Sequence, residues 1–91
     1  MTNSSWYIYI LHCADNTLYT GITTDLDRRL VEHNSSTTKA AKYTRARQPV
    51  RIAYWESASD RSHASRRERE IKRMPKSSKM ALIHQHPHTL R

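Results

Sequence analysis

Two short apolar runs near the start of the chain have the length and composition of β-strands. The first, residues 6–11, is WYIYIL, and the second, residues 18–23, is LYTGIT. Aromatic and β-branched side chains are enriched in strands, and Asp15 and Asn16 between the runs are typical of a turn. The two runs therefore predict an antiparallel β-hairpin.

The residues after the hairpin predict a helix from Thr24 through about Asn34. Thr24 and Asp27 are spaced like the two polar residues of a capping box, which closes the first turn of a helix. Leu26 and Leu30, one turn apart, then face inward.

A polar, basic stretch separates this helix from a third strand. Residues 34–48 contain few apolar side chains and predict a surface loop. Residues 50–56 alternate, with Val50, Ile52 and Tyr54 on one face, which predicts a strand.

The next segment predicts a second helix. Ser59 or Asp60 can cap it, and it runs through Met74. Ala64 and Ile71 belong to its inner, apolar stripe.

Pro75 breaks this helix and can start another over residues 76–84, with residues 85–91 as a flexible tail. The order of the elements is β-β-α-β-α-α. We therefore expect an α/β protein of the α+β type, in which a small three-stranded antiparallel sheet is flanked by helices. One domain over residues 1–84 would form it.

Composition and charge indicate one small domain and a polyanionic partner. The chain has 91 residues, a mass of 10.7 kDa and 36% hydrophobic residues, which leaves no room for a second domain. Sixteen Lys and Arg against eight Asp and Glu give a formal charge of +8. Charge also keeps a small protein soluble, but a field of this strength favours nucleic acid.

The sequence also predicts a cytoplasmic protein without a membrane segment. Cys13 is the only cysteine, so no internal disulfide can form, and residues 1–5 lack the basic start and apolar run of a signal peptide. The longest apolar run, residues 6–11, is far shorter than the roughly 20 residues that cross a bilayer.

Glu68 is a candidate for chemistry because it falls on the inner stripe of the helix that ends at Met74. A buried carboxylate costs desolvation free energy unless it is paired or bound to a metal. The spacing leaves two interpretations open: a salt bridge with one of the many arginines, or a metal ligand.

Two further pairs of side chains are candidates for a shared site. Arg29 and His33 are one helical turn apart, and Tyr9 and Tyr19 lie on adjacent strands of the hairpin and could share a face. Surface pairing and sheet packing also explain such pairs. A catalytic tyrosine would need nearby positive charge to shift its pKa from about 10 toward neutrality.

The basic loop is a candidate nucleic-acid interface. Its cations Lys39, Lys42, Arg45 and Arg47 suit phosphate contacts, and Tyr43 between them suits base stacking. The alternative is an ordinary solvated loop, and the net charge favours nucleic acid.

Taken together, these residues resemble the GIY-YIG nuclease superfamily, and most closely its small single-domain bacterial branch. The resemblance extends from Trp6 to about Ile83, and the two name motifs occur as YIY at residues 7–9 and YTG at residues 19–21. Each motif is short, but their order and their spacing from the later charged residues make the resemblance specific.

The resemblance implies a role for each candidate residue. Tyr9 and Tyr19 correspond to the motif tyrosines, one of which helps to deprotonate the attacking water. Arg29 corresponds to the arginine that steadies charge on the scissile phosphate, and His33 to a histidine that bonds a tyrosine or the phosphate. Glu68 corresponds to the glutamate that holds one divalent cation, Mg²⁺ or Mn²⁺.

Three positions differ from the superfamily pattern. Tyr7 replaces the first motif's glycine, Thr20 replaces the second motif's isoleucine, and Ile22 stands where some branches carry a lysine. Arg28 is a candidate substitute for that lysine. Glu70 is the fallback metal ligand, although its position two residues along the helix turns it away from the inner stripe.

We therefore expect a metal-dependent endonuclease that hydrolyses DNA phosphodiester bonds in repair or recombination. DNA is the expected partner, with RNA left open, and a partner protein could supply specificity. The first alternative is a non-catalytic nucleic-acid-binding module on the same domain, which the missing lysine favours. The second is a small RNA-associated or ribosome-associated protein.

Overall fold

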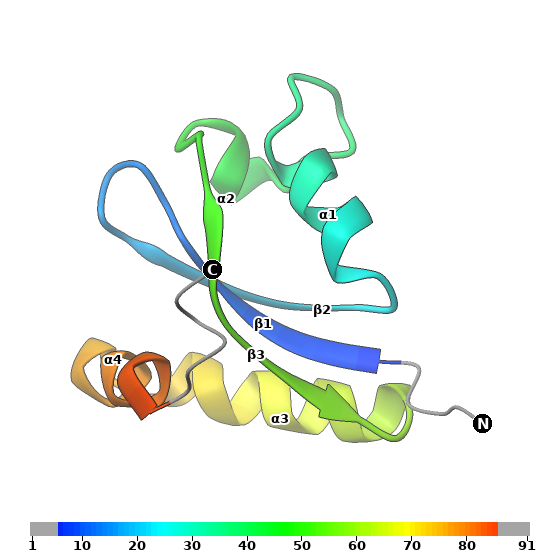
Figure 1. The fold of residues 1–91 in the computed structure, drawn as a ribbon, viewed down its shortest axis with the longest axis vertical. Helices are drawn as coiled ribbons and strands as arrows, with labels where there is room; N and C mark the ends of the chain where they lie inside the picture. Colours follow the sequence, from blue (N-terminus) through cyan, green and yellow to red (C-terminus); the bar gives the residue numbers. More distant parts are fainter. Residues whose placement is uncertain (1–5, 86–91) are drawn as a thin grey trace.

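The computed structural model describes residues 6–85, which form one antiparallel sheet with helices on both sides (Figure 1). β1 (Trp6–His12) is the central strand, and β2 (Leu18–Thr23) and β3 (Arg51–Ala58) pair with it in the order β2-β1-β3. The helices are α1 (Leu26–His33), α2 (Lys42–Arg45), α3 (Arg61–Arg73) and α4 (Lys76–Gln85). The predicted α+β fold with a three-stranded antiparallel sheet is confirmed.

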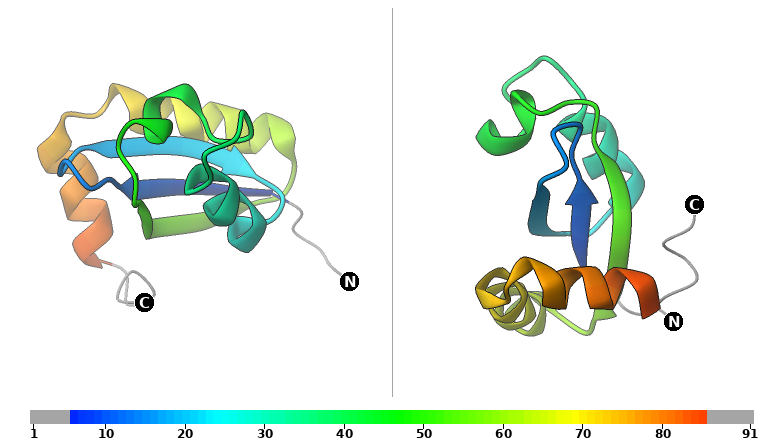
Figure 2. Two further views of the ribbon diagram at one scale, coloured as in Figure 1. Left: turned by 90° about the horizontal axis from the view of Figure 1, so that it is seen from above. Right: turned by 90° about the vertical axis from the view of Figure 1, so that its left-hand side faces the viewer.

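β1 is apolar on both faces because helices cover the sheet on both sides (Figure 2). Successive side chains of a strand point to opposite faces. Ile8 and Ile10 therefore join the core formed with α3 and α4, which we call the α3-side core. Tyr9 and Leu11 join a second core under α1 and the following loop, which we call the α1-side core. All four side chains are at most 2% exposed.

β1 and β2 form the predicted hairpin. Tyr9 pairs with Gly21, and Leu11 pairs with Tyr19. The two tyrosines therefore share a face as diagonal neighbours, two pairs apart along the ladder.

The prediction that Val50, Ile52 and Tyr54 share one face of β3 is wrong. Residues 10–11 of β1 pair with Tyr54 and Ile52, so Ala53 is an extra residue at a β-bulge. Val50 and Ile52 consequently belong to the α1-side core, whereas Tyr54 belongs to the α3-side core. The strand also begins one residue later and ends two residues later than predicted.

α1 begins at a different cap from the one predicted. Asp25 is the N-cap, and its carboxylate accepts a hydrogen bond from the backbone nitrogen of Arg28 at 3.0 Å. The backbone nitrogen of Asp25 donates in turn to Thr23 Oγ1 at 3.1 Å. The expected capping box between Thr24 and Asp27 is therefore replaced by an aspartate cap one residue later.

The segment predicted as a loop contains one turn of helix, α2. Ala40 just before it and Thr44 within it are buried, at 2% and 0% exposure. The side-chain amide of Asn34 bonds both backbone groups of Val50, at 2.7 and 2.9 Å, and so ties the start of the segment to its end. Tertiary contacts therefore hold this segment in place.

α3 follows the sequence prediction. Asp60 is the cap, and its carboxylate accepts a hydrogen bond from the backbone nitrogen of His63 at 2.9 Å. Ala64 and Ile71 are fully buried, as the inner stripe predicts.

α4 ends at Gln85, one residue beyond the predicted boundary. The rest of the predicted tail, residues 86–91, lies outside the described residues. None of the helices within residues 6–85 is long and apolar enough to cross a membrane.

Gly21 is the only glycine, and its φ is not positive, so its backbone angle does not demand a glycine. The reason for a glycine here is the space that a neighbouring side chain occupies. The ring of Tyr9 lies across it. A Cβ atom at position 21 would come within 2.6 Å of Tyr9 Cζ and closer still to the hydroxyl oxygen. Gly21 therefore provides the space that the Tyr9 ring occupies.

Gly21→Ala is expected to displace the Tyr9 ring and to lower the free energy of unfolding by about 1–3 kcal/mol, the range for overpacking a core. Chemical denaturation measures the change. In a Tyr9→Ala background the same substitution should have an effect below about 0.5 kcal/mol, because the clashing ring is gone. Equal effects in both backgrounds would contradict this explanation.

Candidate active site

His33, the last residue of α1, is fully buried and hydrogen-bonded at both ring nitrogens. Its Nε2 lies 2.8 Å from the hydroxyl oxygen of Tyr9, and its Nδ1 lies 2.8 Å from Thr44 Oγ1. Burial, with the positive charge of Arg29 as a second cause, lowers the pKa of His33 to about 4. The imidazole is therefore neutral at pH 7.

Three tyrosines gather around this histidine. The rings of Tyr9 and Tyr19 meet its ring edge-on, with centroid distances of 5.7 and 5.3 Å. Tyr43 stacks on Tyr19 at 5.7 Å, and the guanidinium carbon of Arg47 lies 3.9 Å from the centre of the Tyr43 ring. Tyr9 is 2% exposed and Tyr19 is half-buried, so Tyr19 is the phenol nearer to solvent.

The lowered pKa that a catalytic phenol would need is not found at Tyr9. Burial raises the pKa of Tyr9 to about 12, with Tyr19 and Glu68 adding to the rise and Arg29 opposing it. Tyr9 is therefore a neutral phenol at pH 7. Its hydroxyl can donate a hydrogen bond to a neighbouring acceptor.

Arg29 connects this centre to the basic loop. Its Nη1 lies 2.9 Å from Glu32 Oε1 and donates to the backbone oxygen of Lys39 at 2.7 Å. Arg28, the candidate substitute for the missing lysine, is 58% exposed and lies 3.8 Å from Glu32. The charge that lowers the pKa of Tyr9 is that of Arg29. Arg29 therefore supplies positive charge beside this tyrosine.

Glu68 lies on α3, between the turns that bury Ala64 and Ile71, and 21% of its side chain is exposed. Its carboxylate is 3.2 Å from the ammonium group of Lys72, one turn along the helix. The salt-bridge partner is thus a half-exposed lysine and not an arginine. The negative charge of Glu68 also raises the pKa of Tyr9, so the two groups lie within electrostatic reach.

Glu70, the fallback ligand, belongs to a different network. Its side chain is 54% exposed and lies 3.2 Å from Arg67, which also pairs with Glu56 at 2.9 Å. The hydroxyl of Tyr54 donates to Glu56 as well. Of the two candidate carboxylates, Glu68 is therefore the one associated with the tyrosine and histidine cluster.

The residues present suit a cation held by one carboxylate. No group of three or more His, Cys, Asp or Glu side chains within residues 6–85 could hold a metal ion. Mg²⁺, however, commonly binds through one or two carboxylates together with waters and substrate phosphates. A half-buried Glu68 with a solvent-exposed lysine as its ion-pair partner fits this kind of donor set.

The predicted nucleic-acid-binding residues divide into two groups. Arg47 lies 2.9 Å from Asp15 and donates to the backbone oxygen of Tyr43 at 2.9 Å. Because the Tyr43 ring already contacts Tyr19 and Arg47, these two residues brace the loop. The cations left exposed to solvent are Arg28, Lys39, Lys42 and Arg45.

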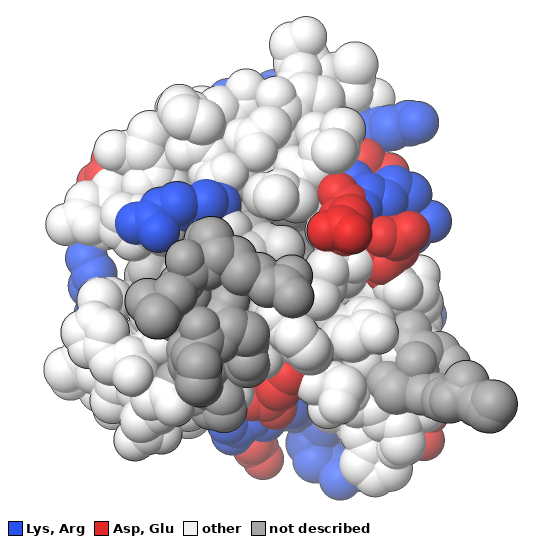
Figure 3. All heavy atoms as spheres, viewed as in Figure 1, with Lys and Arg blue, Asp and Glu red and all other residues white. Residues whose placement is uncertain are grey.

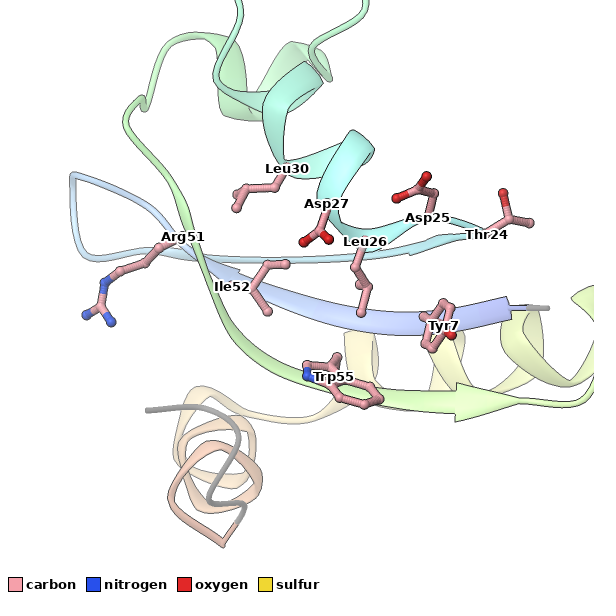
Figure 4. A pocket seen from close by; sticks show the side chains of 9 residues that line it. All are labelled: Tyr7, Thr24, Asp25, Leu26, Asp27, Leu30, Arg51, Ile52 and Trp55. Carbon is pink, nitrogen blue, oxygen red and sulfur yellow. The ribbon is translucent and has the colours of Figure 1, made fainter. Parts of the chain in front are cut away.

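A pocket of about 530 Å³ lies between α1 and β3, outside this cluster (Figure 4). Tyr7, Trp55 and Leu26 line it, together with Asp25 and Asp27. Lys and Arg lie mainly at the rims of the face shown in Figure 3, and carboxylates lie beside α1. Two carboxylates and one cation, Arg51, line this pocket, and their net negative charge would oppose a phosphodiester, so we place the candidate site at the tyrosine and histidine cluster.

Three polar residues position the site, although no pattern in the sequence singles them out. Thr44 bonds the imidazole of His33, and Asn34 fastens the loop to the start of β3. Gln48 Nε2 donates to the backbone oxygens of His33 and Ser35 at 2.9 and 2.5 Å. All three lie within the stretch predicted as a surface loop, where polar side chains are expected.

These features describe a small α+β domain whose polar centre combines a buried Tyr-His pair, an arginine and a carboxylate. Comparison with known proteins agrees with this description. The model of the GIY-YIG catalytic domain matches residues 5–81. The UPF0213 protein DP2720 of Desulfotalea psychrophila is 53% identical over 79 residues, covering 87% of this chain and 71% of that protein.

A second relative, the UPF0213 protein SAG0778 of Streptococcus agalactiae, is 49% identical over 80 residues, covering 88% of this chain and 89% of that protein. The solution NMR structure of the UPF0213 protein BH0048 from Bacillus halodurans aligns with a TM-score of 0.57 and 40% identity. It covers 92% of this chain and 89% of that one. The chain therefore belongs to the GIY-YIG family, a nuclease superfamily, and groups with its small UPF0213 proteins.

The lowered pKa of His33 predicts how stability depends on pH. Between about pH 6.5 and pH 4 the unfolded chain binds a proton at this histidine that the folded protein does not. The free energy of unfolding should therefore fall as the pH falls through this window, by up to about 3 kcal/mol. Urea denaturation at a series of pH values measures it.

His33→Gln is the control, because glutamine does not titrate. Its free energy of unfolding should change less over the same window, even if it is lower at every pH. The carboxylates with lowered pKa values, those of Asp15, Glu32 and Asp60, are present in both proteins. A wild-type stability that stays constant across the window would contradict the burial of a neutral imidazole.

Proposed function

We propose that this protein is a metal-dependent endonuclease that hydrolyses DNA phosphodiester bonds, in repair or recombination. The observation that carries the proposal is the buried hydrogen bond between Tyr9 and neutral His33, with Arg29 and Glu68 acting on the same phenol. Membership of a nuclease superfamily supports the reaction type. The formal charge of +8 supports a nucleic-acid substrate.

Burial distinguishes the tasks of the two tyrosines. Tyr9 is 2% exposed and its hydroxyl is hydrogen-bonded to His33, so its side chain is held in one position in the site. Tyr19 is half-buried and contacts the same imidazole edge-on. Tyr19 is therefore the tyrosine that can reach the attacking water and orient it.

Positive charge then stabilises the negative charge that develops on the phosphate. Arg29 donates to the non-bridging oxygens in place of its present acceptor, the backbone oxygen of Lys39. Glu68 would hold the divalent cation, Mg²⁺ or Mn²⁺, which would supply positive charge to stabilise the reacting phosphate. The site needs no second carboxylate for this arrangement.

Glu68→Gln keeps the size of the side chain but removes the charge that holds the cation. Cleavage of labelled duplex, mismatched and branched DNA in Mg²⁺ or Mn²⁺ is expected to fall by roughly 100-fold or more. DNA binding without metal should be unchanged, and EDTA should abolish cleavage by the wild type.

Glu70→Gln is the matched control on the same helix. Because Glu70 pairs with Arg67 in a separate network, this variant should cleave at the wild-type rate. Cleavage by Glu68→Gln at the wild-type rate would contradict the metal assignment. Equal losses in both variants would indicate damage to α3 instead of loss of a ligand.

The exposed cations Arg28, Lys39, Lys42 and Arg45 would contact the phosphates of DNA. Four phosphate contacts predict a slope of about −3 to −4 for log affinity against log salt. Fluorescence anisotropy at several salt concentrations measures this slope.

Removing three of these cations together, Lys39, Lys42 and Arg45, should bring the slope to about −1. A control variant removes the same number of exposed cations from α3, namely Arg66, Arg69 and Arg73. Its slope should stay near that of the wild type. A wild-type slope near zero would exclude the phosphate contacts.

One observation favours a second candidate, a non-catalytic nucleic-acid-binding module. Ile22 occupies the position at which some branches carry a lysine, and it packs against the α3-side core. Binding without cleavage in either metal would support this module, or a requirement for a partner protein that supplies specificity. Competition between DNA and RNA in the same assay identifies the preferred nucleic acid.

A further inference from the structure

Thr44 is a fully buried hydroxyl residue on α2, and it bonds the side of His33 that faces away from Tyr9. Its Oγ1 lies 2.8 Å from His33 Nδ1, while Tyr9 holds Nε2 at 2.8 Å. Thr44 and His33 are both 0% exposed. Water therefore does not compete for either ring nitrogen, and the protein itself decides where the imidazole proton resides.

The second partner of Thr44 fixes the direction of this hydrogen bond. Thr44 Oγ1 also lies 3.1 Å from the backbone oxygen of Ala41 and donates to it. A carbonyl oxygen can only accept, and a hydroxyl has a single proton. That proton is therefore used on Ala41, and the lone pairs of Thr44 Oγ1 are left for His33.

The directions of the other hydrogen bonds in this series follow from the number of protons available. If Thr44 Oγ1 accepts from His33, the proton of the imidazole lies on Nδ1. A neutral imidazole carries one proton, so Nε2 is the acceptor and the Tyr9 hydroxyl donates to it. The oxygen of Tyr9 then keeps its lone pairs for other donors, and Arg29 is the cation that acts on this oxygen.

We propose that Thr44 is a positioning residue that fixes His33 as the Nδ1-H tautomer, so that Nε2 accepts the Tyr9 hydroxyl and holds the phenol in place. The opposite tautomer would require the Thr44 hydroxyl to donate to His33 and to abandon Ala41. It would also direct two protons at each other, or leave Tyr9 without its acceptor. The role of this tautomer in cleavage rests on the proposed function, whereas the tautomer itself does not.

Two variants separate the hydroxyl from the shape of the side chain. Thr44→Val keeps the branched shape and removes the hydroxyl, and Thr44→Ser keeps the hydroxyl. Long-range ¹H–¹⁵N correlation spectra of ¹⁵N-histidine-labelled protein at pH 7 distinguish the two neutral tautomers. The His33→Gln variant identifies the signals of His33.

We expect the Nδ1-H pattern in the wild type and in Thr44→Ser, and a mixed or Nε2-H pattern in Thr44→Val. Cleavage should fall about 10- to 100-fold in Thr44→Val, as for other residues that orient a functional side chain, and recover in Thr44→Ser. An Nε2-H pattern in the wild type, or an unchanged Nδ1-H pattern in Thr44→Val, would overturn the proposal.

The tautomer is read without DNA or metal, so the two proposals can fail separately. A protein that shows the Nδ1-H pattern but cuts no DNA would retain this inference and lose the proposed function. If Thr44→Val does not fold, the spectrum of the wild type still decides the assignment. The wild-type Nδ1-H pattern supports it, and any other pattern refutes it.

Discussion

The hydrogen bond between Tyr9 and His33 is the contact on which the organisation of this domain depends. It joins the central strand to the end of α1, across 24 positions of sequence, inside the α1-side core. A polar pair can occupy a core at low cost only when each group finds its partner. Gly21 makes room for the phenol and Thr44 completes the bonding of the imidazole, so both residues serve this single contact.

Around this contact the protein separates neutral groups from charged ones. Tyr9 and His33 are both uncharged at pH 7, because burial raises the pKa of the phenol and lowers that of the imidazole. The charges of Arg29 and Glu68 are only partly buried, and so remain accessible from solvent. Fixed charges beside rigid neutral side chains can stabilise a reacting phosphate with little rearrangement of the site.

The sheet and α3 could be predicted because their burial follows regular periods in the sequence, as Ala64 and Ile71 do on α3. The bulge at Ala53 could not, since one extra residue changes the face of its neighbours without disturbing the apparent alternation. α2 has four residues and no apolar stripe. A helix of that length does not form by itself, so tertiary contacts determine it.

The candidate site was predictable to a similar extent. Tyr9, Tyr19 and His33 come together because a hairpin and the following helix place them there, and their spacing could be read along the chain. Thr44 approaches His33 only through the path of the intervening loop. The direction of the Tyr9 pKa shift also depends on burial in three dimensions, so the sequence could state only the shift that catalysis would need, and the structure has the opposite one.

The single turn of α2 has a buried side chain on one side and exposed side chains on the other. Thr44 is buried against His33, while its neighbours Lys42 and Arg45 are exposed. A phosphate held by those cations would therefore restrain the same peptide units that hold the imidazole. Thermodynamic linkage makes such an effect mutual. If binding of a nucleic acid helps to order the imidazole of His33, then a protein in which this imidazole is already ordered binds the nucleic acid more tightly.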